Sequence, residues 1–117
     1  IGVLAQRLVR VLDPNTRTPF TAGDYERRLL NLQPGDPAPT LYRPGGQGSG
    51  GYRGRTGIYE LIVVDEAMRT MIHDGASEQD LERHARLTTP SIREDGLARA
   101  LRGETTVEEV LRVTRED

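Results

Sequence analysis

The sequence predicts an α+β domain that is mostly helical. Residues 8–12 alternate in polarity and residues 55–64 are rich in β-branched side chains, so each segment is typical of a strand. Four short helical patterns follow the second strand. We expect an antiparallel strand pair that is interrupted by a small insert and followed by a four-helix C-terminal cluster. The 117 residues suit one domain.

The N-terminal segment, residues 1–12, is predicted to contain a helix and a strand. Leu4, Leu8 and Val9 fall on one face of a short helix. From Leu8 onward the pattern changes to alternation, which favours a short strand that ends at Leu12. The chain is therefore expected to enter the insert from a strand.

The insert, residues 13–53, is predicted to have little regular structure. The stretch DPNTRTPF contains two prolines and an asparagine, which interrupt regular elements. Thr21 and Asp24 form a weak helix start, and NLQPGDPAP ends that helix. Residues 40–53 are expected to form a glycine-rich loop.

Residues 54–117 are predicted to form a strand and a helical subdomain. RTGIYELIVV is the strongest strand pattern in the chain. Helix-capping residues open the four helices, at Asp65, Ser77, Ser91 and Thr106. Short amphipathic helices are not stable alone in water, so we expect these to pack on one another and on the strand.

Composition excludes several kinds of site. A net charge of −2 disfavours a nucleic-acid partner. The absence of cysteine excludes disulfides and thiolate metal ligands. All 16 basic residues are arginine, so the chain supplies no lysine base, Schiff-base lysine or P-loop lysine. No apolar run is long enough to span a membrane, and the first residue is not a methionine, so we expect a cut made inside a longer protein.

The glycine-rich segment PGGQGSGG raises the question of a nucleotide site. Gly46, Gly48 and Gly51 satisfy the G-x-G-x-x-G spacing. The dinucleotide-binding mechanism requires a strand before the glycines and a helix after them. Here a coil precedes them and a strand follows, so we interpret the segment as a flexible connector.

Other polar residues indicate no catalytic group of their own. His73 and His84 are interpreted as partly exposed helix residues. Glu60 and Asp65 flank the main strand and could form a carboxylate pair, although a strand-end charge and a helix cap explain them more simply. Residues 93–95 are expected to form a solvated helix start. No Ser-His-Asp or metal-ligand spacing is present.

Four segments resemble the C-terminal end of bacterial type II secretion ATPases, which are close relatives of the type IV pilus assembly ATPases. They are GVLAQRLVRVL, GYRGRTGIYEL, IHDGASEQDLERHAR and PSIREDGLARALRGETTVEEVLRVT. The resemblance covers nearly the whole chain. It implies that residues 1–12 end a RecA-like core, that 13–53 lie at the place of the family's metal module, and that 54–117 complete the motor lobe.

The resemblance also implies a zinc module from which this chain departs. The family carries two C-P-x-C pairs that form a tetrahedral zinc site. Asp13 and Thr16 stand at the first pair, and Pro44 and Gln47 at the second. We therefore expect no zinc and a looser insert. Natural loss, or replacement of the cysteines together with a Gly/Ser linker, would each explain this sequence.

One functional residue follows from the resemblance, the arginine of the G-R-T-G turn. In the family it lies near the nucleotide phosphates in the assembled ring, which implies that role for Arg55, with Arg53 as a less secure neighbour. A guanidinium has a planar donor fork that suits phosphate oxygens and the charge that develops in phosphoryl transfer. The alternative role for Arg55 is a salt bridge at the strand end.

The function implied by the resemblance is that of a hexameric motor. The whole protein would hydrolyse ATP with Mg²⁺ at the cytoplasmic face of the inner membrane and drive pseudopilus assembly. Its partners would be the other hexamer subunits and the inner-membrane secretion platform proteins. The Walker motifs would lie upstream, so this piece alone should be inactive. The alternatives are a type IV pilus assembly ATPase and a non-catalytic helical protein-interaction module.

Overall fold

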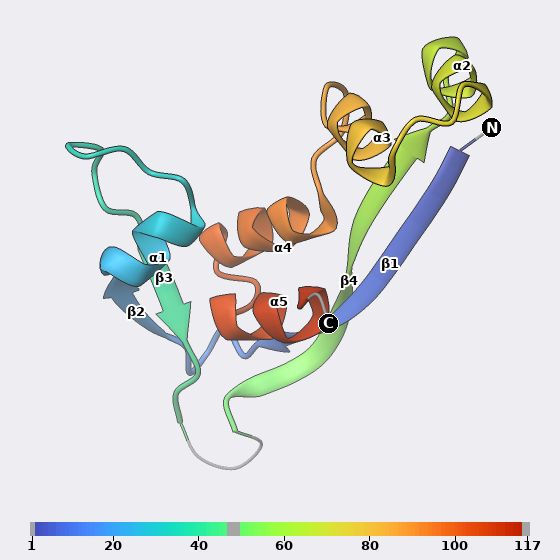
Figure 1. Cartoon of the computed structure of the whole chain (residues 1–117). Helices are drawn as coiled ribbons and strands as arrows, with labels where there is room; N and C mark the ends of the chain where they lie inside the picture. The colour runs from blue at the N-terminus through green and yellow to red at the C-terminus, as the bar shows by residue number, and fades with distance from the viewer. Residues whose placement is uncertain (1, 47–49, 116–117) are drawn as a thin grey trace.

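The computed structural model describes residues 2–46 and 50–115, which form a mixed α/β structure (Figure 1). Its elements are β1 (Gly2–Leu12), β2 (Thr18–Thr21), α1 (Asp24–Leu29), β3 (Thr40–Arg43), β4 (Tyr52–Val63), α2 (Glu66–His73), α3 (Glu78–Ala85), α4 (Ile92–Leu101) and α5 (Val107–Thr114). No helix in the described part of the chain is long and apolar enough to cross a membrane.

A long, twisted, two-stranded ribbon is the main feature of the fold. β1 and β4 pair antiparallel from Gly2 opposite Val63 to Leu12 opposite Tyr52. The antiparallel pairing predicted for residues 8–12 and 55–64 is confirmed. The first of these strands is longer than predicted, because residues 2–7 are part of β1. The helix predicted within residues 1–12 is therefore wrong: pairing along the whole of β4 outweighs the local helical spacing.

The insert contains more regular structure than its sequence predicts. β2 and β3 pair antiparallel, and the short helix α1 lies between them in the chain. The predictions of irregular structure at 18–21 and of a loop over all of 40–53 are wrong, because each segment supplies the other's hydrogen-bonding partner. The predicted helix is present, but it is capped by Gly23, whose backbone N–H donates to Glu26 Oε1 at 2.7 Å.

The C-terminal helices form two pairs, so the predicted single four-helix cluster is wrong. α4 and α5 lie against the middle of the ribbon, whereas α2 and α3 lie at its far end, near the N-terminus (Figure 1). The ribbon is long enough to give each pair its own surface. The predicted helix starts are confirmed, because each side chain accepts a hydrogen bond from the backbone N–H three residues on: Asp65, Ser77, Ser91 and Thr106.

The core lies between the ribbon, the α4–α5 pair and the insert. Val9 and Ile58 are completely buried on the ribbon face that the helices cover. Ala22 and Leu41 of the insert belong to the same buried cluster as Val110 of α5. The insert is therefore packed against the helices. The opposite face of the ribbon has exposed apolar side chains, with Leu4 63% and Leu8 49% exposed.

Candidate functional site

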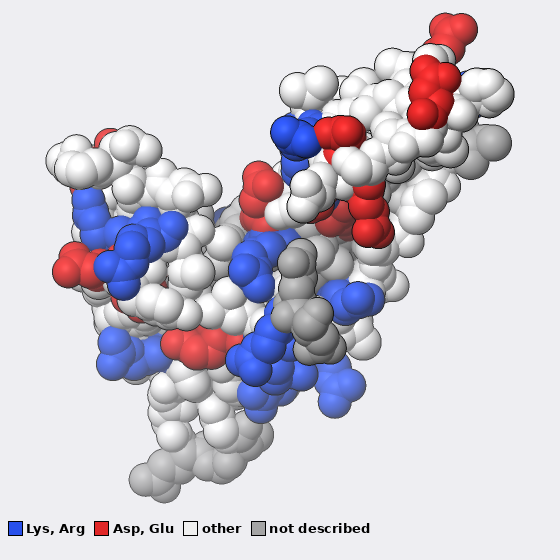
Figure 2. All heavy atoms as spheres, in the orientation of Figure 1, with Lys and Arg blue, Asp and Glu red and all other residues white. Residues whose placement is uncertain are grey.

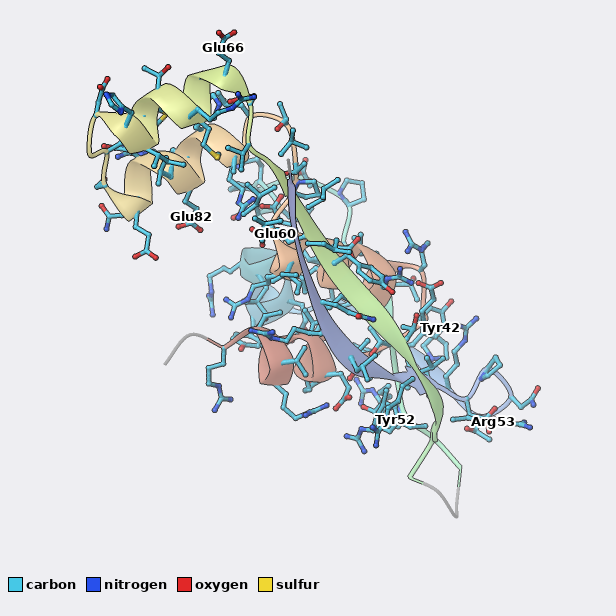
Figure 3. The ribbon with its side chains drawn as sticks, turned by 90° about the vertical axis from the view of Figure 1, so that its right-hand side faces the viewer. Tyr42, Tyr52, Arg53, Glu60, Glu66 and Glu82 are labelled. Carbon is cyan, nitrogen blue, oxygen red and sulfur yellow. The ribbon has the colours of Figure 1, made fainter. Side chains whose placement is uncertain are left out.

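A β-bulge places Arg55 beside Arg10. Arg10 lies opposite Arg55, and the next register pair is Leu12 with Tyr52, so β4 carries an extra residue here. Gly54 has a φ of 80°, a left-handed conformation that glycine adopts readily. Paired residues project from the same face of a sheet, so Arg55 and Arg10 share a face. Arg53 lies on the opposite side of the β4 ribbon from Tyr52 (Figure 3).

Three arginines gather at this point of the ribbon. Leu8, Arg10, Arg55 and Arg112 line a pocket of about 380 Å³, which we call the arginine pocket. Its residues come from β1, β4 and α5. Figure 2 shows arginine side chains gathered over α5 and the neighbouring ribbon. The pocket therefore has the charge and the donor groups that suit an anion.

A buried carboxylate positions two of these arginines. Glu109 is only 2% exposed. Its Oε2 accepts a hydrogen bond from Arg10 Nη2 at 2.8 Å, and its Oε1 accepts one from Arg112 Nη2 at 3.0 Å. Oε1 also accepts the backbone N–H of Arg10 at 2.9 Å. The Arg10 guanidinium lies 4.2 Å from the centre of the Tyr52 ring, so it is held from two sides.

The charge balance of the arginine pocket is positive. Burial alone would raise the pKa of Glu109, but the hydrogen bonds from Arg10 and Arg112 outweigh it and lower that pKa from 4.5 to about 2. The same hydrogen bonds raise the pKa of both arginines. Glu109 therefore stays ionised near neutral pH and neutralises one of the three guanidinium charges that line the pocket or adjoin it.

Acid is expected to weaken the fold through Glu109. Because the folded-state pKa is depressed, the contribution of this carboxylate to stability is complete above about pH 4.5 and is lost as the pH falls towards about 2. Urea unfolding measured across this range should show a steeper decline for the unmodified protein than for Glu109→Gln. Equal declines in the two proteins would contradict this prediction.

Arg55 differs from its two neighbours in the pocket. Its side chain is exposed, and no hydrogen bond or ion pair joins it to any other described residue. Within residues 2–46 and 50–115, Arg55 therefore does not form the strand-end salt bridge that was its alternative role. Its guanidinium donors remain available for a ligand, whereas those of Arg10 and Arg112 are partly used by Glu109.

Comparison with known proteins gives the same family as the sequence motifs. Residues 1–112 match the family described as "Type II/IV secretion system protein". The chain belongs to this type II/IV secretion family. It is 58% identical to "Type II secretion system protein E" of Pseudomonas aeruginosa, which matches 100% of the chain, and 50% identical to "Type II secretion system ATPase E" of Vibrio cholerae, which matches 99%. It spans only 24% of the length of each of these relatives.

Glu60, Asp65 and His84 of this type II/IV secretion family member have structural partners. Asp65 caps α2, with Met68 N donating to its Oδ1 at 2.8 Å, as predicted. It also lies 3.0 Å from His84 Nε2, which links α2 to α3. Glu60 accepts from Arg86 Nη2 at 2.7 Å and from the Ile92 backbone at 2.8 Å. These contacts give Glu60 and Asp65 structural roles, and the two carboxylates do not form a catalytic pair with each other.

The prediction of a solvated start for α4 is wrong for two of its three residues. Arg93 Nε donates to Thr114 Oγ1 at 3.0 Å, and Asp95 Oδ2 accepts the backbone N–H of Tyr59 at 2.8 Å. Only Glu94 has the predicted local role, as part of a capping box. Arg93 and Asp95 therefore attach α4 to α5 and to the ribbon, contacts that depend on the tertiary fold.

The glycine-rich segment connects two strands. Gly46 and Gly51 lie between β3 and β4, whereas Gln47 and Gly48 lie outside the described residues. A strand follows the glycines, so no helix N-terminus is available here to bind a phosphate. The geometry therefore favours the interpretation of this segment as a connector.

Proposed function

We propose that this chain is the C-terminal part of an ATP-hydrolysing motor that powers type II protein secretion. Relatives of the chain are named type II secretion proteins, and one of them is named an ATPase. Since the chain spans about a quarter of those relatives, hydrolysis belongs to the whole protein. In this proposal β1 ends a RecA-like core, and residues upstream bind ATP and Mg²⁺.

The observation that carries this proposal is the guanidinium of Arg55 in the arginine pocket, which is not paired with any residue that the structure describes. A permanent cation with a planar donor fork stabilises phosphate oxygens and the charge that develops during phosphoryl transfer. Arg10 and Arg112 add positive charge on the same face, and Glu109 holds both in place. We propose that Arg55 contacts the nucleotide phosphates when the motor assembles.

The partners in this proposal are the other subunits of a hexamer and the inner-membrane secretion platform proteins. Those contacts would place the protein at the cytoplasmic face of the inner membrane. The names of the relatives favour secretion over pilus assembly as the process driven. A helical interaction module without a nucleotide role gives no reason for an exposed arginine in a cationic pocket.

Replacing Arg55 by alanine in the whole protein is expected to lower ATP turnover at least tenfold, which corresponds to about 1.4 kcal/mol of lost transition-state stabilisation. Arg53→Ala is the matched control, because Arg53 is also exposed, is two residues away, and does not line the pocket. Steady-state phosphate release by the purified protein measures the effect. Equal turnover of both variants and the unmodified protein would contradict the role of Arg55.

A further inference from the structure

We infer that the insert keeps its fold without a metal ion. Direct contact holds together the two turns at which, by the resemblance, the family carries its zinc-binding cysteines. The first turn contains Asp13 and Thr16, and the second begins at Pro44. This inference concerns only the insert, so it does not depend on the proposed ATPase function. It rests on the donor groups of these turns and on the space between them.

The donor groups do not fit a structural zinc site. Such a site takes four ligands, which are mainly cysteine and histidine. The chain has no cysteine, and the described residues contain no group of three or more histidine, aspartate or glutamate side chains that could hold a metal. Asp13 Oδ1 accepts the backbone N–H of Asn15 at 3.0 Å, so this carboxylate closes its own turn. Pro44 has no donor atom in its side chain.

The two turns are in direct contact with each other. A Cβ atom added to Gly45 would lie 2.2 Å from the carbonyl oxygen of Thr16, which is far inside contact distance. One added to Gly46 would lie 2.9 Å from both Cβ and Cγ2 of Thr16. Four thiolates about 2.3 Å from a zinc ion would hold two such turns apart. Here Thr16 packs directly on the glycine backbone.

The hydroxyl group of Thr16 is buried by this close contact between the turns. Its Oγ1 has no hydrogen-bond partner among residues 2–46 and 50–115, although a buried hydroxyl normally finds one. The side chain therefore acts as a space-filling group between the turns. The backbone N–H of Asp13 donates to the Gly51 carbonyl at 2.9 Å, which closes the base of the insert.

Other contacts attach the insert to the helices. Arg17 Nη1 donates to the carbonyl of Gly103 at 2.6 Å, and its guanidinium lies 4.4 Å from the centre of the Tyr42 ring. Arg43 stacks on Phe20 at 4.3 Å across the β2–β3 pair. These stacked arginines and the buried Leu41 stabilise the insert by means that need no metal.

The metal-free state is tested on the purified whole protein, produced in medium that is supplemented with zinc. Elemental analysis should find zinc far below one ion per chain. Hydrogen exchange over residues 18–43 should be the same before and after treatment with a strong chelator. Stoichiometric zinc whose removal speeds exchange in this segment would overturn the inference. ATP turnover plays no part in this test, so its result is independent of the proposed function.

The turn-to-turn contact is tested by Gly45→Ala, with Gly35→Ala as the control. Gly35 lies in the same insert, and nothing lies within 4 Å of an added Cβ there. Its φ of 94° strains alanine, so this control gives the effect of backbone strain without a contact, whereas the φ of Gly45 is not left-handed. Gly45→Ala should speed hydrogen exchange over residues 18–43 more than tenfold beyond the control. If the two variants behave alike, the contact does not hold the insert. Should Gly45→Ala fail to fold, the milder Thr16→Ser takes its place: faster exchange confined to the insert supports the contact, and unchanged exchange overturns it.

Discussion

Replacement of Glu109 by alanine is expected to lower the free energy of unfolding by about 3 kcal/mol. The carboxylate is buried, and its oxygens accept hydrogen bonds from the backbone of Arg10 and from the guanidinium groups of Arg10 and Arg112. Removing it leaves the Arg10 N–H without its acceptor and two arginines close together without a neutralising charge. Urea unfolding near neutral pH measures the loss.

Glu108→Ala is the matched control for this variant. Glu108 is the adjacent residue in the first turn of α5, but its side chain is exposed. Its loss removes only a favourable charge near the helix N-terminus, which is worth about 0.5 kcal/mol. If both variants lost the same stability, the buried ion network would not be a major source of stability at this site.

Replacement of Gly96 by valine is expected to cost about 3 kcal/mol of stability. Gly96 is buried where α4 meets α5 and the ribbon. An added Cβ would lie 2.6 Å from Cγ1 of Val110 and 3.1 Å from Cδ1 of Ile58. Both neighbours are completely buried, so neither can move aside without disturbing the core. Thermal or urea unfolding of the variant measures the cost.

Ala98→Val separates this packing effect from helix propensity. Ala98 lies two residues further along α4 and is only partly buried. Valine there should cost no more than about 1 kcal/mol, because it mainly loses rotamer freedom in the helix. A loss as large as that of Gly96→Val would show that α4 does not tolerate β-branched residues in general. The stability loss of Gly96→Val could then not be attributed to the close packing at Gly96.

Local signals predicted the parts of the fold that depend on local chemistry. Asp65 and Ser91 were identifiable as helix caps, because a capping bond spans only three residues. The main strand was identifiable from its β-branched residues. The helix predicted around Leu4 failed because a distant partner strand supplies the hydrogen bonds of β1. The helices separate into two pairs because the ribbon is long. The sequence analysis did not predict this length, because it predicted a first strand shorter than β1.

The candidate site was only partly accessible from the sequence. The resemblance indicated Arg55, with Arg53 as a less secure neighbour, but it gave no geometric reason for that order. The structure adds the bulge at Gly54, which sets the face on which Arg55 lies. No sequence pattern marked Glu109 as part of a buried ion network. Its contact with Arg10 joins residues at opposite ends of the chain, and no local pattern predicts such a contact.

The long ribbon also has a consequence for how the protein folds. Its strands are separated by the whole insert, and contacts of such long range form slowly because closing a large loop costs conformational entropy. The β2–β3 pair closes a shorter loop than the ribbon does, and the Asp13–Gly51 hydrogen bond brings the two ends of the insert together. We therefore expect the insert to collapse first and act as a nucleus. The ribbon would then pair from Leu12 and Tyr52 towards the N-terminus, so the end that carries Arg10 and Arg55 would form before the end that carries α2 and α3.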